Sequence, residues 1–176
     1  MSELEEKRAQ LAREILQLSR NQLLANLRFL DAALSRLELT ELDGIPFATD
    51  GRELAYDPGH VLKCYKTDRA IPVRDYLHAL LHCIYRHMFV HTLVDHPTWD
   101  LACDIAAEYT ISGLGLKAAN AGRDAVQQEI CRELERQSGL LLRRSFTAII
   151  STGSCRRKSL LICAGFSMQM ITASGT

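Results

Sequence analysis

The sequence predicts a mainly helical α+β fold, with a small β-hairpin between amino-terminal helices and a later helix that carries histidines. Two observations favour helices: apolar residues recur at helical spacing over residues 3–39 and again over residues 74–89. A third observation, the turn residues grouped between positions 43 and 59, separates these segments. At 176 residues, with 47% hydrophobic and 24% charged residues, the chain has the composition of one globular domain.

The amino-terminal segment contains neither proline nor glycine between residues 3 and 39. We expect one long helix there, or two helices broken near residues 19–21. The apolar pieces at 45–48 and 54–56 are flanked by turn residues and fit the two strands of a hairpin. We interpret Asp57-Pro58-Gly59 as one of these turns.

Three more helices are predicted after this hairpin. Pro72, which suits the first turn of a helix, precedes a helix over residues 74–89 with a buried stripe formed by Leu77, Leu81, Ile84 and Met88. The next helix is expected from Trp99 to about Ile111, between a Pro-Thr pair and two glycines. Residues 121–137 are expected to form a further, mostly polar helix.

The charge balance indicates no partner class. Because 21 basic residues balance 21 acidic ones, the net charge favours neither nucleic acid nor an anionic membrane surface. No segment approaches the roughly 20 apolar residues of a membrane span, and no apolar run of a secretory signal follows the charged start. The six cysteines form no C-x-x-C pair and are expected to be reduced thiols. We therefore expect a cytoplasmic protein that binds neither nucleic acid nor membrane.

The carboxyl-terminal tail differs in character from the rest. All 21 acidic residues lie at or before Glu135, so residues 136–176 contain none. One interpretation is a basic arm for anions. Another is a frameshift near residues 140–142, because codons compatible with parts of the tail, read one base earlier, can spell protein-like strings with balanced charge. We divide the chain into a domain at 1–137 and a tail of doubtful structure at 138–176.

His78 and His82 lie four residues apart in the predicted helix over residues 74–89. On a helix this spacing places both imidazoles on one face, roughly 6 Å apart, where they can bind the same metal ion. Their stripe lies about 100° from the buried one, so we expect them at the edge of the core. His87 lies about 140° from His82 and can join such a site only if the helix ends or bends there.

Asp100, Asp104 and Glu108 form an acidic stripe on the following helix. A carboxylate from this stripe could complete a His-His-carboxylate zinc site, or orient a ligating imidazole. The ordinary alternatives are a histidine pair at the edge of the core without a metal, and a solvated acidic face. The residues alone leave these interpretations open.

Four segments, spread over about residues 20–137, have the order and spacing of a known family of sequences. They are residues 27–34, the hairpin at 49–58, the histidine helix, and Trp99-Asp100-Leu101-Ala102-Cys103-Asp104. With these pieces the chain resembles a bacterial family that has an amino-terminal metallopeptidase domain followed by a von Willebrand factor A-like domain. In much of that family an H-E-x-x-H helix has a third histidine five residues on, and a W-x-x-A-x-D element follows.

The resemblance implies a helical zincin-like domain with zinc bound by His78, His82 and Asp104, and with His87 as a further candidate ligand. Relatives of this type are often associated with a MoxR-like AAA+ ATPase, so a partner of that kind, or another protein partner, is expected by analogy. Because the von Willebrand-like domain is absent from these residues, we expect a truncated product.

Position 79 departs from the family pattern. It is alanine where a zincin has the glutamate that takes a proton from the metal-bound water, which contributes roughly 10²- to 10⁴-fold in rate. Glu108 is the one candidate for a substitute base, because it shares a stripe with Asp104. We therefore expect a degenerate, non-hydrolytic zinc-binding module that serves as an interaction or scaffold part. The alternatives are an active zinc peptidase that uses Glu108 and a metal-free helical interaction domain.

Overall fold

The computed structural model describes residues 3–89 and 96–122, together with residues 129 and 132. This part of the chain is mainly helical with one small sheet, which confirms the predicted fold class. In chain order the elements are α1 (Glu3–Asn26), the 3-10 helix η1 (Arg28–Leu30), α2 (Asp31–Leu34), β1 (Glu38–Glu41), β2 (Phe47–Thr49), β3 (Glu53–Tyr56), α3 (Pro58–Thr67), α4 (Ala70–Tyr85), α5 (His96–Leu114) and the 3-10 helix η2 (Lys117–Ala119).

Helix α1 continues through the predicted break at residues 19–21. The Ser19 hydroxyl donates to the Ile15 carbonyl oxygen at 2.8 Å, so this polar side chain is satisfied within the helix. The interruption lies instead at Leu27, whose backbone is not helical (φ −128°, ψ 60°). The buried face of α1, formed by Ala12, Leu16, Ser19 and Leu23, packs against α3 and α4.

The predicted hairpin is present as β2 and β3, which pair antiparallel around a turn at Asp50-Gly51. The Asp50 carboxylate accepts the backbone N–H groups of Arg52 and Glu53, each at 2.8 Å, and Gly51 takes the positive φ of 92° that this turn needs. Strand β1 pairs parallel with β3 and gives the order β1-β3-β2. The expectation that the helical segment reaches residue 39 is therefore wrong, because pairing with β3 outweighs the local helical spacing.

The interpretation of Asp57-Pro58-Gly59 as a turn is also wrong, because these residues begin helix α3. The Asp57 side chain caps the helix by accepting the His60 N–H at 3.0 Å, and Pro58 occupies the first turn. The same residue types serve turns and helix starts, so the local sequence did not distinguish them.

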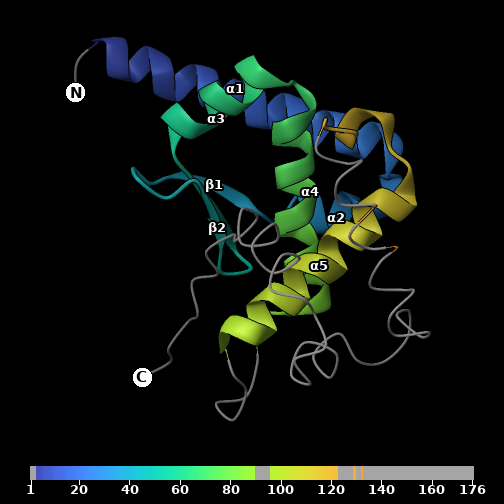
Figure 1. Ribbon diagram of the computed structural model, residues 1–176. Helices are drawn as coiled ribbons and strands as arrows, with labels where there is room; N and C mark the ends of the chain where they lie inside the picture. The colour runs from blue at the N-terminus through green and yellow to red at the C-terminus, as the bar shows by residue number, and fades with distance from the viewer. Residues whose placement is uncertain (1–2, 90–95, 123–128, 130–131, 133–176) are drawn as a thin grey trace.

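Helix α4 is central to the fold and contacts α1, α3, α5 and β2 (Figure 1). It is shifted relative to the predicted range of 74–89: the Asp68 carboxylate accepts the Ala70 N–H at its start, and Arg86 ends it in a left-handed conformation with φ 58°. Helix α5 extends past Gly113 and ends before Gly115, which has φ 60°.

Several expectations concern residues outside the described ones: most of the predicted helix at 121–137, and the tail at 138–176 with its frameshift interpretation. Cys64, Cys83 and Cys103 form no disulfide within the described part of the chain. Among the described helices, none combines the length and the apolar character needed to cross a membrane.

Candidate metal centre

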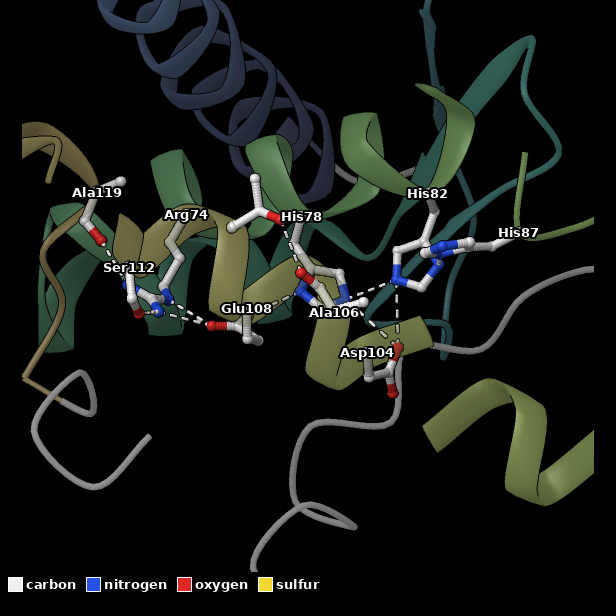
Figure 2. Close-up of polar contacts among 10 residues, drawn as sticks. Arg74, His78, His82, His87, Asp104, Ala106, Glu108, Ser112 and Ala119 are labelled. Carbon is white, nitrogen blue, oxygen red and sulfur yellow. Dashed lines mark hydrogen bonds and ion pairs between the residues drawn. The ribbon is translucent and has the colours of Figure 1, made fainter. Parts of the chain in front are cut away.

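His78 and His82 project from successive turns of α4 toward α5 (Figure 2). Their Nε2 atoms lie 2.8 Å apart and their ring centroids 4.7 Å apart. Both residues are buried, with exposed fractions of 4% and 0%. The expected position at the edge of the core is therefore wrong, because α5 covers this face of α4. Ile84, assigned to the buried stripe, is instead 41% exposed.

Asp104 of α5 completes a triangle with the two imidazoles. Its Oδ1 atom lies 3.4 Å from His78 Nε2 and 3.2 Å from His82 Nε2. Nitrogen and oxygen ligands at about 2.0–2.1 Å from a tetrahedral metal ion lie roughly 3.3 Å from one another. The three sides of the triangle, from 2.8 to 3.4 Å, are close to that spacing. The structure thus brings three predicted ligands into a group that could bind one metal ion.

The donor atoms of this triangle also fit a cation chemically. Asp104 Oδ1 is buried and accepts no hydrogen bond within the described part of the chain, although both imidazoles are within ion-pair distance. An unsatisfied buried acceptor costs about 1–3 kcal/mol. A metal ion would satisfy this oxygen and both Nε2 lone pairs at once.

Glu108 lies behind His78 rather than in the triangle. Its Oε1 is 2.8 Å from His78 Nδ1, while its Oε2 accepts Arg74 Nε at 2.8 Å and lies 2.7 Å from Arg74 Nη2. If Nδ1 donates to this carboxylate, the Nε2 lone pair of His78 faces Asp104 and His82. The sequence left open whether a carboxylate of the acidic stripe completes the metal site or orients an imidazole. In the structure Asp104 lies with the histidine Nε2 atoms, and Glu108 is placed to orient His78.

Arg74 anchors this network, and sequence reasoning missed it. The guanidinium is 1% exposed and also donates to the Ala119 carbonyl oxygen at 3.0 Å, with Ser112 Oγ at 3.4 Å. Figure 2 shows the chain of contacts from Ala119 through Arg74, Glu108 and His78 to His82. The spacing in the sequence could have identified Arg74. Residues 74, 78 and 82 lie four apart on one face of α4, and residues 104, 108 and 112 lie four apart on the facing side of α5.

Burial and neighbouring charges give the histidines of this region different pKa values. Burial lowers the pKa of His78, but the neighbouring Asp104 and Glu108 carboxylates raise it by a larger amount, so the pKa is about 9. Burial lowers the pKa of His82 by more than the nearby Asp104 carboxylate raises it. In the absence of a metal, His78 is therefore the ring that takes up an additional proton and becomes charged, and a metal ion competes with that proton.

His87 borders the triangle from the far side of His82. From the sequence, His87 could approach the other histidines only if the helix ended or bent before it, and α4 does end at Tyr85. The His87 backbone N–H donates to the His82 carbonyl oxygen at 3.1 Å. Its Nδ1 lies 3.3 Å from Nδ1 of His82, whereas the triangle uses the Nε2 atom of that ring. Burial, followed by the charge of His82, lowers the pKa of His87 to about 4.

Ala79 is fully buried in the hydrophobic core, next to His78 in the chain. Its methyl group can neither accept nor donate a proton. Glu108 is the carboxylate predicted as a substitute, and both of its oxygens are engaged by His78 and Arg74. Asp100, which was included in the acidic stripe, is only partly buried and lies one turn before Asp104 on α5.

Comparison with known proteins adds one match. Residues 8–159 match the model of a family described as "Putative metallopeptidase domain", a range that includes α4, α5 and every residue of the triangle. Neither the curated proteins nor the solved structures contain a significant match to the chain.

Proposed function

The chain belongs to this metallopeptidase-domain family, and from that premise we propose that it is a zinc-binding module that does not hydrolyse peptides. The observation that carries the proposal is the buried triangle of His78, His82 and Asp104, set beside an alanine at position 79. The triangle supports metal binding, and Ala79 argues against catalysis of the ordinary kind.

The ligand set supports zinc as the metal. Two imidazoles and one carboxylate are a common set for a zinc ion that keeps a fourth position open. Zinc bound there would polarise a carbonyl oxygen or lower the pKa of a bound water to about 7. The contact of Glu108 with His78 Nδ1 matches the carboxylate–histidine–metal arrangement that orients a ligand and strengthens binding.

Hydrolysis would need a base, and the described residues around the triangle do not provide one. Ala79 cannot accept a proton, and Glu108 is bound on one oxygen by His78 and on the other by the buried Arg74. Moving Glu108 toward a substrate would leave the Arg74 charge buried without its partner, which costs several kcal/mol. The alternative of an active peptidase that uses Glu108 is therefore less favoured than a site that binds metal without turnover.

We propose an interaction or scaffold role for this module within a larger assembly. A MoxR-like AAA+ ATPase or another protein as partner, and a cytoplasmic location, stay predictions from the family resemblance and from the sequence.

The test is metal content by elemental analysis of the full chain, purified without a histidine tag and loaded with zinc. Asp104→Asn should lower the zinc content by about one ion per chain, since it removes the charged ligand. Asp100→Asn, one turn away on the same helix, is the matched control and should keep the native content. Equal zinc in all three proteins would remove the triangle as a metal site.

Catalysis is tested separately with an unstructured protein substrate. The zinc-loaded native chain should release no peptides beyond a chelated sample. Zinc-dependent cleavage that Glu108→Gln abolishes and Asp100→Asn does not would instead establish the peptidase alternative.

A further inference from the structure

A second group of metal-binding side chains lies where α3 meets α4, and it shares no residue with the triangle. We propose that His60, Cys64 and Asp75 bind a divalent ion of the zinc class at this junction. The ion would tie α3 to the helix that carries His78 and His82.

The two ligands on α3 have the spacing that one metal ion needs. His60 and Cys64 lie one turn apart on the same face, and the His60 Nε2 atom is 3.3 Å from Cys64 Sγ. Metal bonds of about 2.0–2.1 Å to nitrogen and about 2.3 Å to sulfur, at a tetrahedral angle, place these atoms roughly 3.6 Å apart. A small side-chain adjustment is enough to admit the ion between them.

Asp75 supplies the third ligand from the second turn of α4. One ligand atom from each of the three residues lies within 4.8 Å of the other two, and all three residues are half-buried. The same three residue types could also form a catalytic triad with a cysteine nucleophile. In such a triad the carboxylate that orients the histidine would lie on the far side of the imidazole from the sulfur. Convergence of all three donors favours a shared cation instead.

Both helices hold these ligands on rigid backbone. The Asp57 side chain fixes the first turn of α3 by accepting the His60 N–H at 3.0 Å. Val61 and Val73, each 1% exposed, anchor α3 and α4 in the core next to the ligands. Ligands placed by packed helices lose little entropy when a metal binds, so the arrangement is suited to binding an ion.

The donor set indicates the kind of metal. A thiolate with an imidazole and a carboxylate suits zinc and its spectroscopic substitute cobalt better than magnesium or calcium, which prefer oxygen ligands. Half-burial of the three residues leaves room for a fourth ligand from solvent.

Cobalt absorption distinguishes this site from the triangle, because only this group contains a cysteine. We expect the full chain titrated with Co²⁺ to develop a thiolate-to-cobalt charge-transfer band in the near ultraviolet, with about one ion bound at this group in addition to any ion bound by the triangle. Cys64→Ser should remove the band. Cys83→Ser, at a half-buried cysteine that contacts Thr49 and Ala79 instead, is the matched control and should keep it.

His60→Gln and Asp75→Asn should each weaken cobalt binding, as read from the same band, by about tenfold or more. Circular dichroism of each metal-free variant, compared with the native chain, checks that these changes leave the fold intact. A native chain without the band, or a band of native strength in Cys64→Ser, would overturn the proposal. Either result can occur whether or not the triangle binds zinc, so the two proposals are tested independently.

Discussion

The Glu108 carboxylate joins His78 to Arg74: it lies 2.8 Å from His78 Nδ1 through one oxygen and accepts Arg74 Nε at 2.8 Å through the other. The contact gives the histidine a defined orientation toward Asp104. It also means that one buried carboxylate neutralises a buried guanidinium and orients a candidate metal ligand. Stability and metal affinity are therefore coupled through Glu108.

Glu108→Gln should weaken both properties. Replacing Glu108 by glutamine removes one charge of the buried Arg74–Glu108 pair, so we expect the metal-free protein to lose about 3 kcal/mol or more in free energy of unfolding. Zinc affinity should fall about 10- to 100-fold, because the orienting partner of a ligand is weakened. Urea denaturation with chelator measures the first effect, and competition with a chromophoric chelator measures the second.

Ser112→Ala is the control for this experiment. It removes the 3.4 Å contact to Arg74 Nη2 and leaves the Arg74–Glu108 pair in place, so it should cost about 1 kcal/mol or less and leave zinc affinity unchanged. A Glu108→Gln protein as stable as Ser112→Ala would show that the Arg74–Glu108 pair contributes little to stability.

The raised pKa of His78 predicts how the stability of the metal-free protein depends on pH. A histidine with a folded pKa of about 9 and an ordinary value of 6.5 stabilises the fold fully below pH 6.5. That contribution is lost as the pH rises toward 9. The lowered pKa values of His82 and His87 act in the opposite sense, so stability should also fall as the pH drops below 6.5.

The measurement is the free energy of unfolding with chelator present, from pH 5 to pH 9. We expect a maximum near pH 6.5 and a decline above it of a few kcal/mol at most, since about 1.4 kcal/mol corresponds to each unit of pKa shift. His78→Gln should flatten the decline between pH 6.5 and pH 9. A native profile that rises through this window would contradict protonation of His78 in the metal-free fold.

The sequence predicted which residues meet at the candidate site better than it predicted their surroundings. Spacing of four residues is enough to put His78 and His82 on one helix face, and a family pattern supplied Asp104. Their burial could not be predicted, because it depends on how α5 crosses α4. Arg74 was missed for the same reason: its partner lies 34 residues away along the chain, and only the crossing of the helices brings the two together.

The fold errors have a similar origin. Strand β1 is stabilised by pairing with β3, which local spacing cannot reveal, and Leu37 just before it fits the helical period of the preceding residues. The start of α3 was a different kind of error. Asp57-Pro58 carries a helix-capping signal, but the same pair begins turns, and only the helix that follows decides between them.

Ala79→Glu tests the proposal that the chain does not hydrolyse peptides because position 79 lacks a carboxylate. A glutamate there would stand one residue after His78, as in an H-E-x-x-H helix, and could accept the proton of a zinc-bound water. We expect zinc-dependent cleavage of an unstructured substrate to rise by about 10²-fold or more over the native chain. Peptide release followed by mass spectrometry, with and without chelator, measures it.

Ala79→Gln is the matched control, because it fills the same buried space without a basic group. Both variants enlarge a fully buried side chain, so both should lower the melting temperature by a similar amount. Cleavage in Ala79→Glu and none in Ala79→Gln would assign the loss of hydrolysis to the alanine. Two folded, zinc-loaded variants that are equally inactive would mean that the site lacks more than this carboxylate, and that its geometry serves metal binding alone.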